Sequence, residues 1–209
     1  AVHTVLGLTA AAAGQMDLAE RLFGAAVEAR PDLALAHVAW GRTLLAVYRW
    51  DDALAQADQA LAVAPKLAAA LLIQGDAYAG LDQHAKAEAA YRAALAARPA
   101  DGVCQIALAR FYRRTDNALG AQRYLQEAWS ADHTQSAALE ELVDSYVENN
   151  KLEIARKCLE EAERADAPED VLRRLRTEIH YATAPLQSAH LAELRRQLEA
   201  HPDDFVTGL

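Results

Sequence analysis

The sequence has 209 residues, of which 53% are hydrophobic, and it carries a formal net charge of −9. This length suffices for one or two domains with a substantial buried core. The acidic balance argues against the basic face that nucleic-acid binding requires, so we expect no nucleic-acid partner. No apolar run approaches the ~20 residues that cross a bilayer, so we expect no membrane insertion.

From its start the chain alternates apolar helical stretches with short turns, and each unit contains two predicted helices. The predicted units occupy residues 1–33, 34–67, 68–101, 102–135 and 136–169. Proline closes the first three units, His133 stands in its place in the fourth, and Pro168 comes one residue late in the fifth. Because proline cannot continue a helix, it defines where the next unit starts.

Small residues recur at the same places in these units. One series consists of Ala19, Ala53, Ala87, Ala121 and Ala155, and a second consists of Ala26, Ala60, Ala94, Ala128 and Ala162. Small side chains let helices pack at the short end of the usual ~8–10 Å range. We therefore predict that Ala53, Ala87 and Ala121 are buried against a neighbouring helix.

The unit at 68–101 shows the pattern most completely. Its characteristic residues are Leu71, Gly75, Tyr78, Ala87, Tyr91, Ala94 and Pro99. Their order and spacing resemble the tetratricopeptide repeat (TPR), a helix–turn–helix unit of about 34 residues. The resemblance covers residues 1–169 and implies an all-α fold, a right-handed α-solenoid of stacked repeats. Such units occur in arrays because neighbouring units bury one continuous core.

The regular spacing breaks after residue 169, and residues 170–209 are interpreted as a degenerate sixth helical pair and the start of a further repeat. A helix is predicted over 170–182, with Val171, Leu172, Leu175 and Ile179 on one side. A second helix is predicted over 186–204, ended by Pro202. Since residues 205–209 look like the opening of another unit, we expect the chain to be a piece of a longer protein.

No catalytic or cofactor motif is present, so we predict neither an enzyme nor a cofactor. His180 and His190 flank a predicted loop, but zinc usually needs three or four protein ligands, so we predict no metal site. Cys104 and Cys158 fall on different helices of different units and are interpreted as free thiols. Free thiols favour a reducing compartment, cytoplasmic rather than periplasmic, and the excess of Arg over Lys with abundant Ala favours a bacterial source.

The resemblance implies that the first helices of successive units line a concave groove. The residues that it places in this groove are Val38, Arg42, Leu45, Leu72, Asp76, Ile106, Arg110, Arg113, Arg114, Glu140 and Asp144. The early units contribute mainly apolar residues, the fourth unit is basic and the fifth is acidic. At one position Arg42, Asp76, Arg110 and Asp144 alternate in sign. We call these four residues the charge ladder. The charge ladder either neutralises the groove and sets the repeat register, or offers its charges to a ligand.

The hypothesis that follows is a protein–protein interaction scaffold that binds a peptide or helix of a partner in the groove. Apolar anchors of the ligand would lie beside Val38, Leu45, Leu72 and Ile106. An acidic group would meet Arg110, Arg113 and Arg114. The alternative is a docking or regulatory arm of a larger enzyme or of a bacterial envelope-assembly protein, truncated here. The sequence leaves the oligomeric state open.

Overall fold

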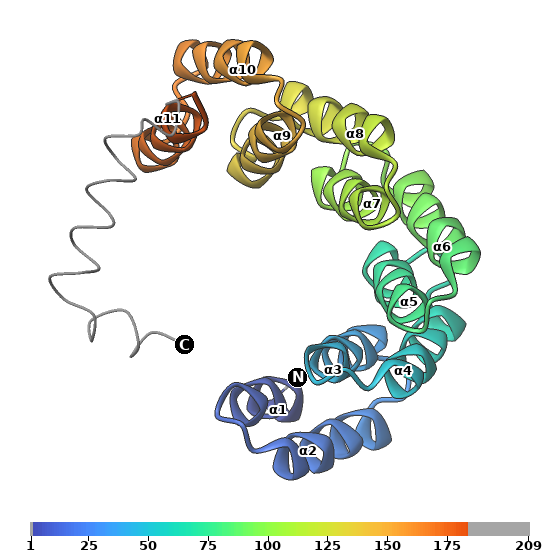
Figure 1. The fold of residues 1–209 in the computed structure, drawn as a ribbon. Helices are drawn as coiled ribbons and strands as arrows, with labels where there is room; N and C mark the ends of the chain where they lie inside the picture. Colours follow the sequence, from blue (N-terminus) through green and yellow to red (C-terminus); the bar gives the residue numbers. More distant parts are fainter. Residues whose placement is uncertain (1, 184–209) are drawn as a thin grey trace, which may run out of the picture. The chain divides into compact units, whose positions relative to one another are not determined.

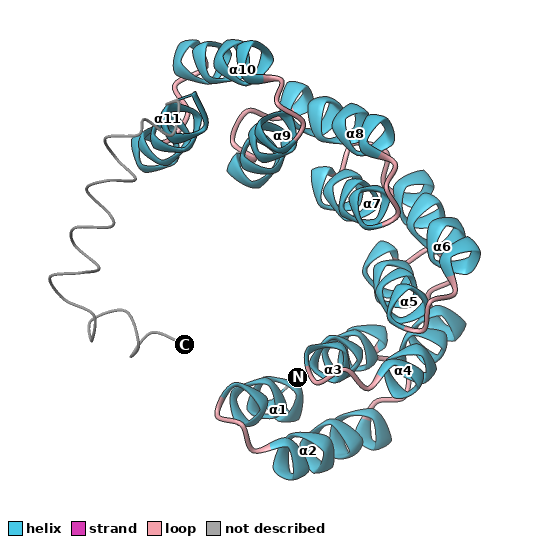
Figure 2. Cartoon of the chain, viewed as in Figure 1, coloured by secondary structure: helices cyan, strands magenta, loops and turns pink. Residues whose placement is uncertain are grey.

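The structure of the protein is a computed structural model that describes residues 2–183. This part is entirely helical and contains eleven helices (Figures 1 and 2). They are α1 (Val2–Ala12), α2 (Met16–Ala29), α3 (Ala34–Ala46), α4 (Trp50–Val63), α5 (Ala68–Gly80), α6 (His84–Ala97), α7 (Gly102–Arg114), α8 (Ala118–Ala131), α9 (Ser136–Glu148), α10 (Leu152–Arg164) and α11 (Glu169–Thr183). The predicted all-α fold is confirmed. The helix predicted over 186–204, with His190 and Pro202, and the repeat expected to start at 205–209 lie outside the described residues.

The turns inside the helix pairs repeat a backbone feature. Residues with positive φ occur at Gly14, Tyr48, Asp82, Asp116 and Asn150, which are spaced evenly by 34 residues. Glycine, asparagine and aspartate tolerate this left-handed conformation, because they lack Cβ or have a short polar side chain that can bond locally. Tyr48 is the exception in this series.

Residues 2–138 form one compact unit, and the described residues 139–183 belong to a second. In the first unit each helix packs on the next, and α1 contacts α3, α3 contacts α5 and α5 contacts α7. Within residues 2–131 no such contact joins α2 to α4, α4 to α6 or α6 to α8. The helix pairs therefore fan out, and the first helices of the pairs line the inner, concave side of this unit (Figure 1).

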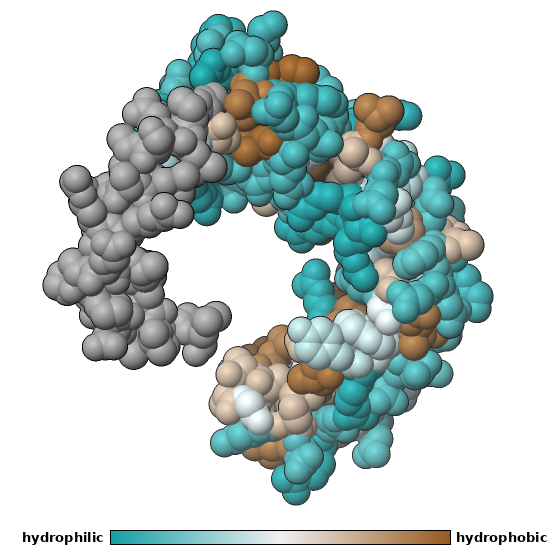
Figure 3. Space-filling view, viewed as in Figure 1, coloured by the Kyte–Doolittle hydropathy of each residue, from teal (hydrophilic) through white to brown (hydrophobic). Residues whose placement is uncertain are grey.

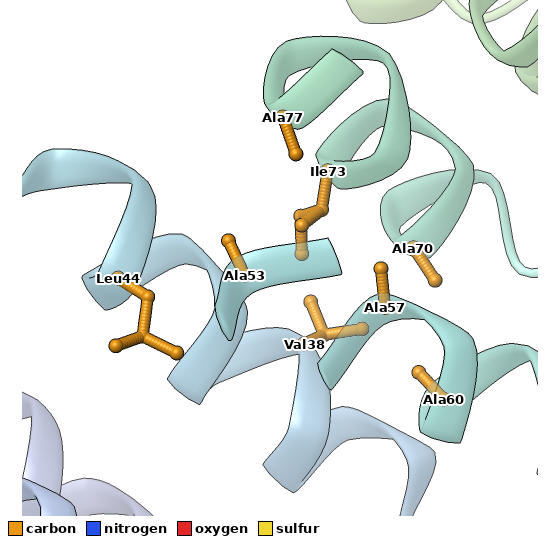
Figure 4. Packing of buried hydrophobic residues seen from close by; sticks show 8 residues of the cluster. All are labelled: Val38, Leu44, Ala53, Ala57, Ala60, Ala70, Ile73 and Ala77. Atoms are coloured by element: carbon orange, nitrogen blue, oxygen red, sulfur yellow. The ribbon is translucent and has the colours of Figure 1, made fainter. Parts of the chain in front are cut away.

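Alanine provides the close contacts between helices of this stack. Ala53, Ala87 and Ala121 are all fully buried, which confirms the prediction. Around Ala53, one apolar cluster comprises Val38, Leu44, Ala53, Ala57, Ala60, Ala70, Ile73 and Ala77 (Figure 4). Ile73 fills the space beside Gly41, where an added Cβ would lie 3.3 Å from its side chain. Ile73 of α5 thus packs against small residues of α3 and α4.

In two pairs a glycine of the first helix lies directly under an aromatic ring of the second. A Cβ added to Gly7 would come within 2.9 Å of the Phe23 ring. A Cβ added to Gly75 would come within 2.6 Å of the Tyr91 ring. Both rings are buried, with 0% and 2% of their surface exposed. These glycines are required by a close approach, because any larger residue would displace the ring.

In the second unit α11 packs on α10. The four apolar residues predicted to share one side of the helix, Val171, Leu172, Leu175 and Ile179, are all buried, as expected. Cys104 in the first unit and Cys158 in the second are buried free thiols, which also agrees with the prediction. Burial raises the pKa of each thiol to about 11. Among the described helices none has the length and apolar character to cross a membrane.

Apolar side chains also lie on the surface at the beginning of the array. Val2, Val5, Leu6 and Leu8 of α1 are exposed, and Figure 3 shows hydrophobic residues gathered over this helix. Farther along the first unit, the inner helices show a mixture of hydrophobic and hydrophilic residues (Figure 3). The candidate site lies there, on α3, α5 and α7.

Candidate functional site

A hollow of about 430 Å³ lies between the inner helices α3, α5 and α7, with one wall from α6. We call it the arginine hollow. Its lining consists of Arg42, Ala69, Leu72, Ile73, Asp76, Tyr91, Val103, Ile106, Ala107, Arg110, Phe111, Arg114 and Ala137. Apolar side chains make up most of this set, and all four of its charged groups come from consecutive first helices. Helical stacking thus brings together residues that are about 34 positions apart in sequence.

Asp76 is the single acidic group of the arginine hollow. The Tyr91 hydroxyl donates a hydrogen bond of 2.5 Å to Asp76 Oδ1. Although Asp76 keeps contact with solvent, the protein atoms around it partly desolvate its carboxylate, and this raises its pKa. The Tyr91 hydrogen bond and the positive charges of Arg114, Arg110 and Arg42 oppose this rise. Burial and the neighbouring carboxylate also raise the pKa of Tyr91, so its hydroxyl remains a donor.

The arginine side chains outnumber this carboxylate. Among residues 2–183, no hydrogen bond or close ion pair to another side chain joins the guanidinium group of Arg42 or Arg114, although both attract Asp76 at longer range. One carboxylate cannot neutralise two guanidinium groups, so the hollow carries excess positive charge inside a protein whose net charge is −9. An anionic group with an apolar stem suits such a surface.

Six of the eleven residues predicted for the groove line the arginine hollow: Arg42, Leu72, Asp76, Ile106, Arg110 and Arg114. Val38 belongs to the buried cluster of Figure 4, and Leu45 lines an adjacent hollow. Arg113 is exposed on α7, but it is not part of the lining. Three members of the charge ladder, Arg42, Asp76 and Arg110, therefore share one hollow on the first-helix side.

The adjacent hollow measures about 500 Å³ and is lined by Leu45, Ala46, Tyr48, Trp50, Asp76, Gly80 and Arg114. We call it the aromatic hollow. It shares Asp76 and Arg114 with the arginine hollow, so the two adjoin at these residues. Tyr48 and Trp50 meet edge to face, with ring centroids 5.4 Å apart.

Sequence reasoning missed several of these lining residues. Tyr91 was identified only as a characteristic residue of the repeat; its ring is buried, and its hydroxyl bonds Asp76 in the hollow. The available signal was the pairing of Gly75 with an aromatic residue on the second helix. Tyr48 and Trp50 were missed as site residues, although a tyrosine at a turn position that holds Gly, Asp or Asn in the other units could have drawn attention to them.

The remaining two predicted residues, Glu140 and Asp144, belong to the second unit. Glu140 forms an ion pair with Arg174 of α11. The protonated carboxyl of Glu178 on α11 donates a hydrogen bond to Asp144, and Glu148 lies near the same carboxyl. Partial burial, followed by the negative charge of Asp144, raises the pKa of Glu178 to about 7. In the part of the chain that the structure describes, no three His, Cys, Asp or Glu side chains are grouped as metal ligands would be.

Comparison with known families agrees with this architecture. Residues 38–102, which include α4, α5 and α6, match the family model of the tetratricopeptide repeat. This segment is similar to the tetratricopeptide repeat, and the fold of the chain is similar to that of a solved TPR protein. No curated protein sequence matches it.

Solved structures of TPR proteins share the fold. A thermophilic TPR protein from Thermus thermophilus, TTC0263, is 20% identical, with a TM-score of 0.66 over 85% of this chain and 97% of that one. The pilF protein of Pseudomonas aeruginosa is 16% identical, with a TM-score of 0.66 over 94% of this chain and 96% of that one. YrrB, described as a TPR protein with an unusual peptide-binding site, is 20% identical, with a TM-score of 0.53 over 87% of this chain and 93% of that one.

Proposed function

We propose that this protein is a protein-interaction scaffold without catalytic activity, and that the concave side of its first unit binds a peptide or helix of a partner protein. The arginine hollow is the anchor point of this interaction. The ligand contributes an acidic side chain or a terminal carboxylate, and its apolar stem lies against Leu72 and Ile106.

The observation that carries the proposal is the combination of apolar walls with excess arginine in one hollow. A carboxylate that enters between Arg42 and Arg114 gains charge-assisted hydrogen bonds, which are roughly twice as strong as neutral ones. An exposed ion pair contributes little to affinity. Burial of the ligand's apolar stem against Leu72 and Ile106 therefore supplies additional binding free energy. The Tyr91 hydrogen bond fixes Asp76 in the centre of the hollow, and the Asp76 carboxylate attracts the surrounding arginines.

The TPR fold supports the proposal in a general way, since the peptide-binding site described for YrrB shows that a protein of this fold can bind a peptide. The choice of an acidic ligand does not come from that likeness. It comes from Arg42 and Arg114, whose charges the described residues leave only partly compensated.

The test compares two neighbouring arginines of α7. Arg114→Gln removes a charge from the arginine hollow, whereas Arg113→Gln removes the same charge from an exposed position outside its lining. The probe is a fluorescein-labelled octapeptide of glycine and serine that contains one leucine and one glutamate, and binding is followed by fluorescence anisotropy. We expect Arg114→Gln to weaken binding by about tenfold, equivalent to about 1.4 kcal/mol, while Arg113→Gln stays within about twofold of wild type.

Thermal unfolding provides the control for folding. Both arginines are exposed, so each substitution is expected to change stability by no more than about 0.5 kcal/mol. Equal loss of binding in the two variants would mean that general charge, rather than the arginine hollow, attracts the peptide. Unchanged binding in Arg114→Gln would remove the basis of the proposal.

A further inference from the structure

Tyr48 occupies a turn position where its residue type is unfavourable. Its φ is 60°, and the equivalent positions of the other turns in this series hold Gly14, Asp82, Asp116 and Asn150. A bulky L-residue is disfavoured in this region, because its Cβ approaches the following carbonyl oxygen. Strain of this kind persists where the surrounding structure maintains it, and it is concentrated at functional sites.

Burial does not explain the tyrosine. Tyr48 is 75% exposed, and its ring contacts the Trp50 ring only edge to face. A residue that is strained in its backbone and gains little core contact contributes little to folding. Its ring is instead displayed toward solvent at the border of the aromatic hollow.

Trp50 gives this ring a fixed neighbour. A Cβ added to Gly80 would lie only 2.5 Å from the Trp50 ring, so the indole is seated directly on the end of α5. Trp50 is half-buried there, and Leu45 lines the same hollow. The aromatic hollow is therefore preformed, with a firm indole wall, an aliphatic wall and the exposed Tyr48 ring.

We propose that the aromatic hollow binds an aromatic side chain of the same peptide whose carboxylate enters the arginine hollow, and that Tyr48 contacts this side chain directly. The inference rests on the proposed function and specifies its ligand: a short segment with an aromatic residue close to an acidic one. The two hollows share Arg114 and Asp76, so both groups come from neighbouring positions of one segment. Aromatic pairs and apolar burial favour the first group, and the positive charge of Arg114 favours the second.

The test uses labelled octapeptides of glycine and serine that carry phenylalanine and glutamate, separated by zero to three serines, with matched peptides in which serine replaces either residue. Wild type is expected to bind the best phenylalanine–glutamate peptide about tenfold more tightly than its serine–glutamate counterpart, as burial of one aromatic ring allows. Tyr48→Asn places at this turn the residue type found at Asn150. It is expected to reduce that preference to about twofold or less and to leave the melting temperature unchanged or higher.

Two further variants make the comparison specific. Tyr48→Phe keeps the ring and is expected to keep the preference for phenylalanine. Leu119→Asn removes another large apolar residue that is 75% exposed, on the outer helix α8 and away from both hollow linings, and is expected to leave binding unchanged.

The outcomes separate this inference from the proposed function. Binding of glutamate peptides without a preference for phenylalanine would overturn the aromatic hollow as a site and leave the scaffold proposal intact. A preference that survives in Tyr48→Asn, or a fall of more than about 4 °C in its melting temperature, would show that Tyr48 is not a ligand contact. If wild type binds none of the peptides, both proposals fail.

Discussion

Replacing Gly75 by alanine tests the packing that shapes the arginine hollow. The added Cβ would lie 2.6, 2.7 and 2.8 Å from three atoms of the Tyr91 ring. Carbon atoms in contact normally lie about 3.5–4.0 Å apart, so the ring must move by about 1 Å. Tyr91 has little room, since it is 2% exposed and its hydroxyl bonds Asp76 at 2.5 Å.

The expected cost follows from three contributions. Overpacking a well-packed site costs about 1–3 kcal/mol, and losing the partly buried hydrogen bond to a charged group costs about 1–3 kcal/mol more if the bond breaks. Alanine in a helix interior recovers about 1 kcal/mol relative to glycine. We therefore expect Gly75→Ala to destabilise the protein by about 0–2 kcal/mol if the hydrogen bond survives and by about 1–5 kcal/mol if it breaks. In the second case peptide binding also weakens, because Asp76 loses its partner Tyr91.

Gly24→Ala is the matched control. Gly24 also lies inside a helix, α2, but an added Cβ there would meet no atom within 4 Å. This variant is expected to gain up to about 1 kcal/mol from helix propensity alone. Thermal unfolding followed by circular dichroism measures both, with a shift of about 2–4 °C per kcal/mol for a chain of this size. If Gly75→Ala is as stable as Gly24→Ala, the contact between Gly75 and Tyr91 does not constrain the hollow as argued.

Two other predictions concern the core and the second unit. Ala87→Leu, at a fully buried position of α6, is expected to lower stability by about 1–3 kcal/mol. Ala89→Leu, on the exposed side of the same helix, should change stability by no more than about 0.5 kcal/mol. Equal melting temperatures of the two variants would contradict the assignment of Ala87 to the helix contact. The pKa of Glu178 is about 7 in the folded protein against an ordinary value of 4.5, so the folded state binds the extra proton between these values and loses stability as pH rises through them. Glu178→Gln should therefore gain melting temperature relative to wild type as pH increases from about 5 to about 8, and a difference that does not depend on pH would refute the raised pKa of Glu178.

Much of the fold could be predicted because the repeat is specified by the types and spacing of residues within each unit. The alanine series predicts buried contact positions, and Ala53, Ala87 and Ala121 are buried as predicted. The apolar face of α11 was predicted correctly in the same way, although the regular repeat had ended. Helical periodicity and side-chain size suffice for such statements, since both act between residues close in sequence or one unit apart.

The candidate site was predictable only in outline. The repeat register placed Arg42, Asp76 and Arg110 on one side of successive helices, and all three line the arginine hollow. The register treated Arg113 and Arg114 alike, yet only Arg114 lines the hollow. Consecutive residues on a helix point about 100° apart, so the exact rotation of α7 against its neighbours decides which of them enters.

The sequence by itself determined the helical repeat, its spacing and the small residues that let the helices approach, because these depend on local conformation and on side-chain volume. The tertiary structure alone decided which side chains meet across units: the Tyr91 hydroxyl on Asp76, the Trp50 indole on Gly80, and the positive φ that displays Tyr48 at the edge of a hollow. Such contacts depend on how far each helix rotates and shifts against the next. That choice is made by packing the whole array, where a difference of about 1 Å separates a contact from a clash.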